Sequence, residues 1–534
     1  MMPLFKCKIW NKNLPMKIDN KKLNGIVYTP QWIVGLILDN LDYKSDIHNK
    51  KIIDPACGAG AFLTEIVVRF IEDARKSKIE DEAIKTKIEN NIFGFDIDKE
   101  AVKKCISILD KIAQKYGLKN IKWNILNTDS LDKSFFSKFF DSFDYVVGNP
   151  PYIRIQHLGL KRREKIQNDW HLCKKGSTDI FIAFFELGYH LLNKTGKLGY
   201  ITPNTYIKTK AGEDLRKFIK FHRILKTMID FEHNQLFDNA TTYSLITILD
   251  KNHKKNTFSL FKGDKEKIDF IDEIDIENLS DDNWILTSND ILKKLNHIEK
   301  RGLPLGKIAE IHVGITTLAD NYYIFKDIEF TKHLAKIRLK DGRVFKVEKE
   351  ILKPIIKASV LKNSNEEQNR FIIFPYKKVG DKHQIIEETE LREKYPYTYN
   401  YFKAIKEVLD RRDKGKPNPV AWYAFGRSQG IDTSFGKKIL TSPINQKPNF
   451  IVWEKEEYTF YAGYCIKLDG DLHLLAQYLN SKDMEFYINY VSRDYQNSYK
   501  SFAKSFIEKF GIEDLNLINH QKQNQLLLQN CLRL

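Results

Sequence analysis

The sequence has no apolar run approaching the roughly 20 residues that cross a bilayer. Its first residues, "MMPLFKCKIWNKNLP", lack the apolar core of a signal peptide. We therefore expect a cytoplasmic protein without a membrane partner. The six cysteines are scattered, with no CxxC pair and no histidine nearby at ligand spacing. This argues against a disulfide framework and a zinc site, and we expect no bound metal.

Acidic residues are outnumbered: 70 Asp and Glu face 87 Lys and Arg, which gives a formal net charge of +17. Such a surface attracts polyanions, so nucleic acid is the leading partner class. A chain of 534 residues is also too long for one ordinary hydrophobic core. We therefore expect at least two domains.

The first half alternates apolar strand-like segments with helical ones. Strands are predicted at 51–56, 92–98, 121–126 and 143–148, then in "GKLGYITP", "ILKTMIDF" and "TTYSLITILD". No helix separates the last two, which predicts an antiparallel pair at the sheet edge. Strands alternating with helices indicate a mostly parallel sheet covered on both faces. The prediction is a seven-stranded nucleotide-binding α/β domain over residues 1–255.

The second half has a different construction. Residues 256–300 are polar and charged, and we interpret them as a connecting segment with little core. Residues 301–534 are rich in aromatic and basic side chains and lose the strand–helix rhythm. They predict a second domain of mixed α+β type, in which Arg427, Lys437, Lys438, Arg493 and Lys500 are basic residues in candidate loops.

Polar residues follow the ends of three successive predicted strands. Gly58 and Gly60 in "DPACGAGAF" allow a tight turn before a helix. Asp96 is placed to accept hydrogen bonds from two ribose hydroxyls, and Asp129 in "NTDSL" from the exocyclic amine of an adenine. Because the turn lacks the GK[ST] of a P-loop, a triphosphate ligand is disfavoured.

The fourth predicted strand ends in "NPPY", residues 149–152. Pro150 and Pro151 cannot continue a ladder, so the backbone leaves the sheet in a fixed direction. The Asn149 amide oxygen and the Pro150 carbonyl can then accept both hydrogens of a planar amine, whose lone pair becomes available to attack. Tyr152 offers a ring on which a base can stack.

In this order, "GIVYTP", "DPACGAGAF", "GFDID", "NTDSL", "NPPY" and "DIFIAF" resemble the motifs of S-adenosylmethionine-dependent DNA adenine-N6 methyltransferases. The arrangement is similar to the gamma, TaqI-like class of bacterial restriction-modification systems. "HVGITTLADNYYIFK", "ILKPIIKASVLK" and "LLAQYLNSKDMEFYINYVS" also resemble segments of that family's recognition region. The resemblance implies a Rossmann-like methyltransferase domain over 1–255 and a DNA target-recognition domain over 301–534.

The resemblance also implies roles for individual residues. Asn149, Pro150, Pro151 and Tyr152 would be catalytic, and Tyr152 and Phe237 would pack against the flipped target base. The implied S-adenosylmethionine-binding residues are Tyr28, Thr29, Pro30, Asp54, Ala56, Gly58, Gly60, Asp96, Ile97, Asp129, Asn149, Pro151 and Phe184. Double-stranded DNA is the implied substrate, and a separate cognate endonuclease belongs to such a system. We expect a monomer.

The basic segment 154–176 follows the catalytic tetrapeptide directly. Its residues Arg154, Lys161, Arg162 and Arg163 are candidate phosphate contacts, in a flap over the base pocket. The alternative is a solvated charged helix.

Other functions stay open at this point. Cytosine-N4 transfer poses the same chemical problem, but its enzymes usually carry serine where Asn149 stands. Methyltransferases of RNA bases or of a protein glutamine share NPPY, but generally lack a "GIVYTP"-like motif and a large second domain. Only 24 residues precede Gly25, so we do not expect a fused nuclease. A DNA-binding relative that has lost catalysis is the remaining alternative.

Overall fold

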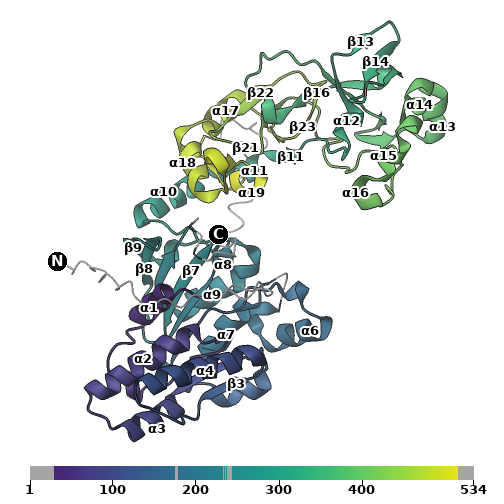
Figure 1. The fold of residues 1–534 in the computed structure, drawn as a ribbon. Coiled ribbons are helices and arrows are strands. Elements are labelled where there is room, and N and C mark those ends of the chain that lie inside the picture. The colour runs from purple at the N-terminus through teal and green to yellow at the C-terminus, as the bar shows by residue number, and fades with distance from the viewer. Residues whose placement is uncertain (1–28, 175–177, 233, 235, 237–242, 515–534) are drawn as a thin grey trace. The chain divides into compact units, whose positions relative to one another are not determined.

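The chain divides into two compact units, of which the first ends at Leu292 and the second begins at Lys293. A computed structural model describes residues 29–174, 178–232, 234, 236 and 243–514 (Figure 1). The boundary falls inside helix α10 (Asn289–Lys300), within the segment predicted as a connection. Tyr28 and Phe237 lie outside the described residues.

Unit 1 is built on one mixed sheet with the strand order β3-β2-β1-β4-β5-β7-β6-β8-β9. Its strands are β1 (Ile52–Asp54), β2 (Ile92–Asp96), β3 (Asn124–Asn127), β4 (Phe143–Gly148), β5 (Leu192–Pro203), β6 (Leu225–Asp230), β7 (Ser244–Asp250), β8 (Thr257–Gly263) and β9 (Ile268–Asp275). The first five pair in parallel, and β7 runs antiparallel to both β5 and β6. This confirms the predicted α/β domain and the antiparallel pair.

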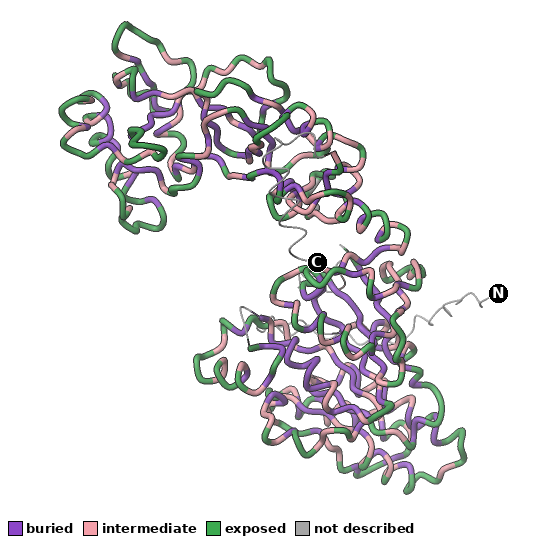
Figure 2. The backbone as a smooth tube through the Cα atoms, turned by 180° about the vertical axis from the view of Figure 1, so that it is seen from behind, coloured by how far each residue is buried: buried purple, intermediate pink, exposed green. Residues whose placement is uncertain are grey.

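Both faces of this sheet are covered by helices. Neighbouring residues of a strand point to opposite faces, and residues on each face are buried in a separate core. Ile53 and Val146 face a core shared with α7 and α9, whereas Ile52 and Val147 face a core shared with α1, α2, α3 and α4. Figure 2 shows the buried backbone following these strands. The near-continuous apolar strands are therefore those of a covered, largely parallel sheet.

The helices of unit 1 connect these strands. They are α1 (Gln31–Asn40), α2 (Ala61–Lys76), α3 (Asp81–Asn91), α4 (Lys99–Lys115), α5 (Lys133–Phe136), α6 (Leu160–Asp169), α7 (Phe181–Leu191), α8 (Thr205–Lys208) and α9 (Glu213–His222). Among the described residues, no helix is long and apolar enough to cross a membrane.

The sheet is two strands wider than predicted, because the segment 256–300 is not a simple connection. Strand β8 pairs parallel to β6 and antiparallel to β9, so β6 is not the sheet edge. Phe258, Leu260 and Trp284 are buried in the core of unit 1. The charged run between the two strands forms their turn, and its composition concealed the strands on either side.

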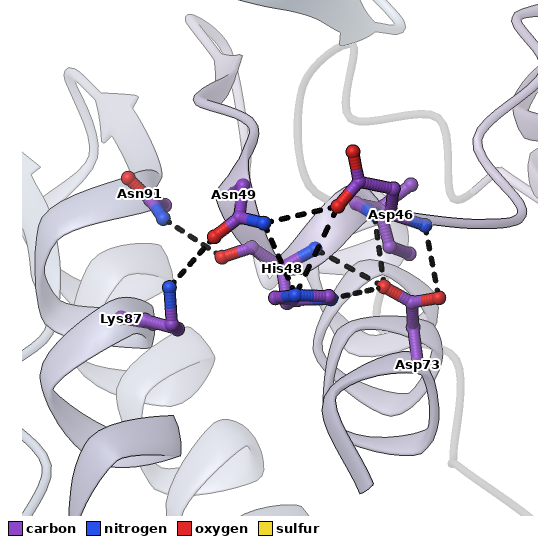
Figure 3. A network of polar contacts seen from close by, with 7 residues as sticks. Asp46, His48, Asn49, Asp73, Lys87 and Asn91 are labelled. Carbon is purple, nitrogen blue, oxygen red and sulfur yellow. Dashed lines mark hydrogen bonds and ion pairs between the residues drawn. The ribbon is translucent and has the colours of Figure 1, made fainter. Parts of the chain in front are cut away.

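A buried polar network lies at the amino end of β1 (Figure 3). The Asp73 carboxylate of α2 accepts hydrogen bonds from the backbone N–H groups of Asp46, Ile47 and His48 at 3.1, 2.9 and 3.2 Å. Its Oδ2 also lies 2.6 Å from Nδ1 of the His48 ring. Asn49 and Asn91 extend the network to Asp46 Oδ1 and the His48 carbonyl. The network fixes the chain entering β1 against α2 and α3.

Unit 2 contains several small sheets, which confirms its mixed α+β construction. Two have four strands, ordered β11-β24-β20-β22 and β12-β17-β16-β23, and β13-β14-β15 and β21-β26-β25 have three. The strands are β10 (Leu303–Pro304), β11 (Glu310–Val313), β12 (Ile324–Lys326), β13 (Glu329–Phe330), β14 (Leu334–Arg338), β15 (Val344–Glu348), β16 (Leu352–Lys357), β17 (Arg370–Ile373), β18 (Tyr376–Val379), β19 (Lys382–Ile385), β20 (Lys438–Thr441), β21 (Ile444–Asn445), β22 (Phe450–Trp453), β23 (Thr459–Tyr461), β24 (Tyr464–Lys467), β25 (Asp494–Tyr495), β26 (Tyr499–Ser501) and β27 (Gly511–Ile512).

Short helices pack around these sheets. They are α11 (Leu305–Ile308), α12 (Asp320–Tyr323), α13 (Glu388–Lys394), α14 (Pro396–Ala404), α15 (Lys406–Asp410), α16 (Arg412–Gly415), α17 (Leu472–Leu479), α18 (Lys482–Val491) and α19 (Lys504–Ile507). An aromatic core that includes Tyr323, Tyr401 and Phe402 joins α12 and α14 to the sheets.

Candidate functional site

The carboxyl ends of β1, β2, β3 and β4 meet at one edge of the unit 1 sheet, because these strands are adjacent and parallel. Asp54 ends β1, Asp96 ends β2, Asp129 follows β3 and Asn149 follows β4. In open α/β sheets this edge is where ligands bind. The four polar residues that the sequence predicted for a site therefore share one edge.

Asp54 is a buried carboxyl at the centre of this edge. Asp54 is only 1% exposed, and its Oδ1 accepts a hydrogen bond from the Ala56 N–H at 3.0 Å. A Cβ placed on Gly148 would come within 2.8 Å of the same oxygen, so glycine there leaves room for the carboxyl. Burial raises the pKa of Asp54 to about 8, against the hydrogen bond from Ala56 and with a further rise from nearby Asp96.

The glycine turn after β1 is hydrogen-bonded to Asp96. Gly58 has φ +52, and its N–H donates to Asp96 Oδ2 at 2.8 Å, while Asp96 Oδ1 accepts from Asp98 N–H at 2.8 Å. A Cβ on Gly58 would meet no atom within 4 Å, so the turn borders open space. At Gly60, with φ +90, a Cβ would lie 2.7 Å from Cys105 Sγ of α4. The two glycines thus permit the turn for different reasons.

Asp129 is held by a cation from α6. Arg162 Nη2 lies 3.1 Å from Asp129 Oδ2, and the Leu131 N–H donates to Asp129 Oδ1 at 3.1 Å. A second pair, Lys165 to Asp132 at 3.1 Å, joins the same helix to the same loop. Any phosphate contact by Arg162 would have to replace this ion pair. Arg162 is therefore the least available of the predicted DNA contacts.

Asn149 has one end of its amide occupied and the other free. Its Nδ2 donates to Thr29 Oγ1 at 3.1 Å, across 120 positions of sequence. Its Oδ1 is buried and has no hydrogen-bond partner among the described residues. An unpaired buried acceptor costs free energy unless a ligand donates to it. The amide orientation makes the oxygen, not the nitrogen, the group available to a ligand.

The remaining residues of the tetrapeptide lie beside aromatic and backbone groups. The Tyr152 hydroxyl donates to the Ile201 carbonyl at 3.4 Å, and its ring packs edge-on against Phe181 of α7 at 6.5 Å. Pro150 is buried and Pro151 half-buried. Phe184 of α7 is buried in the core of unit 1, 5% exposed.

The other predicted residues are placed as follows. Pro30 caps α1, Ala56 is half-buried in the turn after β1, and Ile97 is exposed after β2. Arg154 forms a β-bridge with Asp179, and Lys161 is exposed on α6. Arg163, also on α6, donates to Gln167 at 3.3 Å.

Two residues of the site had no signal in the sequence. Ser130 Oγ donates to the Pro55 carbonyl at 2.5 Å, which ties the β3 loop to the β1 turn. Tyr200 of β5 lies beside Gly148, and its buried hydroxyl has no partner among the described residues. In unit 2, Lys438 and Lys500 are not in loops as expected. Lys500 lies in β26, and Lys438 is buried in β20 and donates to the carbonyls of Gly436 and Tyr458.

Among the described residues, no group of three or more histidine, cysteine or acidic side chains is placed to hold a metal ion.

Known proteins resemble both the site and the whole chain. Residues 90–237 match the family model of the Eco57I restriction-modification methylase. The Type II restriction enzyme and methyltransferase RM.Eco57I of Escherichia coli is 32% identical over 480 residues, covering 76% of this chain. The Type II methyltransferase M.BstVI of Geobacillus stearothermophilus is 24% identical over 94% of this chain. The chain is similar to restriction-modification DNA methyltransferases over most of its length.

The chain matches these relatives over different shares of their length. It spans 48% of RM.Eco57I, about half, and 92% of M.BstVI. The solved structure of the restriction-modification enzyme MmeI in complex with DNA shares the fold with a TM-score of 0.52 at 13% identity, covering 89% of this chain and 65% of MmeI.

S-adenosylmethionine is the cofactor of this methylase family, and the site of unit 1 fits it. Open space borders the Gly58 turn, and three carboxyl groups and the unpartnered Asn149 oxygen lie at the same edge of the sheet. The three carboxyl groups can accept from the hydroxyl and amino groups that the cofactor carries, and the Asn149 oxygen remains free for another donor.

Proposed function

We propose that this protein transfers a methyl group from S-adenosylmethionine to N6 of an adenine flipped out of double-stranded DNA. It would modify one recognition sequence and protect host DNA within a restriction-modification system. The observation that carries the proposal is the Asn149 oxygen, which is buried and has no partner among the described residues, at the edge where open α/β sheets bind ligands.

Asn149 and Pro150 would grip the amine of the target base. The Asn149 Oδ1 and the Pro150 carbonyl accept its two hydrogens, which draws the nitrogen towards tetrahedral geometry and frees its lone pair. Thr29 keeps the Asn149 amide in the productive orientation by accepting from Nδ2. The protein's contribution is therefore mainly positioning and electrostatics.

The base must leave the duplex, because its amine is hidden in pairing. We propose that Tyr152, with Phe237, replaces the stacking that the flipped base loses, at about 1–3 kcal/mol per base. The hydroxyl of Tyr152, bound to the Ile201 carbonyl, holds the ring in place.

When bound, the cofactor supplies a methyl group already activated on a sulfonium. The N6 nitrogen, held by Asn149 and the Pro150 carbonyl, would take up that methyl group in place of one of its protons, which would pass to solvent. We propose that Thr29 and Asp54 lie beside the methionine part, that Asp96 holds the ribose, and that Asp129 accepts from the adenine amine.

Cytosine-N4 transfer and a silent DNA-binding relative are the alternatives. Asparagine at position 149 favours adenine, and the Asn149 oxygen left free for a donor favours catalysis. We further propose that the chain acts as a monomer alongside a separate endonuclease of the same specificity.

Incubating the protein with unmethylated genomic DNA and S-adenosylmethionine, followed by long-read sequencing, tests the function. We expect N6-methyladenine at one recurring sequence. N4-methylcytosine would establish the rival chemistry instead. Unmodified DNA, together with calorimetric binding of the cofactor, would favour the silent relative.

Cofactor binding is expected to strengthen as pH rises from about 6 to about 8, by up to tenfold per unit. In the free protein the raised pKa of Asp54 keeps its carboxyl protonated at neutral pH. A cationic amino group beside it favours the carboxylate, so binding should release a proton. Titration calorimetry in buffers of different ionisation heat measures that release directly.

The matched control is Asp54→Asn, which keeps the shape and removes the titration. The cofactor's own amino group titrates near pH 8, so the two proteins are compared at about pH 6.5, where that group is protonated both before and after binding. Equal proton release by wild type and variant would contradict the role of Asp54.

A further inference from the structure

The short element α16 of unit 2 is not a regular helix, because two of its residues hold an unfavourable backbone conformation. Asp413 (φ +49, ψ +40) and Lys414 (φ +63, ψ +31) both adopt left-handed conformations, followed by Gly415 at φ +79. For residues other than glycine this conformation is unfavourable, because the Cβ atom comes too close to a carbonyl oxygen. Two consecutive non-glycine residues in it, over residues 411–416, need compensation from the surrounding structure. We call these residues the cationic loop.

The compensation comes from a buried arginine beneath the loop. The Arg412 guanidinium donates to four carbonyl oxygens, of Leu409 at 2.9 Å, Thr317 at 3.2 Å, Ala424 at 2.8 Å and Trp422 at 2.8 Å. Arg412 is only 9% exposed. Its charge is therefore used to fix the loop and is not presented to solvent.

A second arginine braces the loop from the side. The two terminal nitrogens of Arg427 each lie 3.1 Å from one carboxylate oxygen of Asp413. This bidentate geometry neutralises the acid within the loop and restricts its rotation. Two exposed lysines, Lys414 and Lys416, then remain on a backbone held by contacts on two sides.

The acid nearest to the cations at the tip is Asp413, whose carboxylate is already paired with Arg427. Neither Lys414 nor Lys416 has a side-chain hydrogen bond or an ion pair within 4 Å among the described residues. Arg411 has only exposed Glu407, at 3.9 Å. The loop therefore carries a net positive charge, with two exposed lysines on a braced backbone, which suits the phosphates of a duplex.

We propose that the cationic loop binds the DNA phosphate backbone, with Lys414 and Lys416 as the contacting side chains and the Arg427–Asp413 pair as their brace. This inference rests on the proposed action on double-stranded DNA. Phosphate contacts set affinity and register without reading sequence. The loop thus anchors the duplex on unit 2 whatever the recognition sequence is.

The test is the full-length double variant Lys414→Gln/Lys416→Gln. Its affinity for a short fluorescein-labelled duplex of mixed sequence is measured by anisotropy across a potassium chloride series. Each lost phosphate contact lowers the slope of log affinity against log salt by about 0.9, so we expect a decrease of about 1.8. At about 0.1 M salt the affinity should fall roughly tenfold or more. Calorimetric S-adenosylmethionine binding should not change.

The matched control is Lys378→Gln/Lys382→Gln, which removes two exposed lysines from the β18–β19 hairpin of the same unit. It should leave the slope within a few tenths of the wild-type value. Equal losses in both variants, or an unchanged slope in the loop variant, would overturn the inference alone. A wild-type protein that binds no duplex would overturn the proposed substrate as well.

Discussion

Asn149→Ala is expected to lower methyl transfer by about 100- to 1,000-fold or more, the range seen when one preorganised polar group is removed from an active site. Alanine removes the buried acceptor that the proposed mechanism places on the target amine. It also removes the donor that engages Thr29. Cofactor affinity should change little, because the carboxyl groups of Asp54, Asp96 and Asp129 and the glycine turn stay in place.

Two measurements separate these effects. Incorporation of tritiated methyl groups into genomic DNA reports transfer, and calorimetry reports cofactor binding. Asn193→Ala is the matched control, because Asn193 of β5 donates to Asp144, at the opposite end of the sheet from the site. Turnover of Asn149→Ala close to that of wild type would refute the proposed mechanism.

Asp73→Ala is expected to destabilise unit 1 by about 3–5 kcal/mol, the typical cost of breaking a buried charged network. Three backbone N–H groups and the His48 ring would lose their acceptor at once (Figure 3). Asp39→Ala is the matched control, because Asp39 pairs with Arg69 at the surface, where such pairs contribute about 0–1 kcal/mol. Urea-dependent hydrogen exchange of peptides from β1 and α2 measures the loss of stability in each of the two variants. Equal protection in the two variants would contradict the prediction.

The same network gives an acid-sensitive contribution to stability. Burial alone would raise the pKa of Asp73, but hydrogen bonds from the His48 ring and the backbone of His48 and Ile47 outweigh it and lower the pKa. The contribution is present above the ordinary aspartate pKa of about 4, and is lost as pH falls through the lowered native value. In acid titrations of unfolding, the Asp73→Asn variant should therefore not show the loss of stability that protonation of Asp73 causes in the wild type.

The sequence predicted the centre of unit 1 well because its strands carry unambiguous signals. β1, β2 and β4 are buried on both faces, so they read as apolar runs that end in Asp54, Asp96 and Asn149. The two outer strands β8 and β9 were missed. Only one side of β8 is buried, at Phe258 and Leu260, and a charged turn dominates the local composition.

Contacts between residues far apart in the sequence could not be predicted from the local sequence pattern. The Thr29–Asn149 hydrogen bond joins residues 120 positions apart, and nothing in "LKRREK" distinguishes Arg162, which pairs with Asp129, from its neighbours. Lys438 looked like a loop residue, but its flanking Ile439 and Leu440 place it in a buried strand. The cationic loop was missed too, because left-handed backbone at Asp413 and Lys414 leaves no trace in composition.

The strand order of unit 1 has a consequence for synthesis on the ribosome. Central strand β1 pairs with β2 and with β4, whose first residue, Phe143, is 89 positions beyond Asp54 (143 − 54). At about 5–20 residues per second, β1 keeps one edge unpaired for about 4–18 s after it emerges. The nascent chain should be most prone to aggregation, and most dependent on chaperones, during that interval.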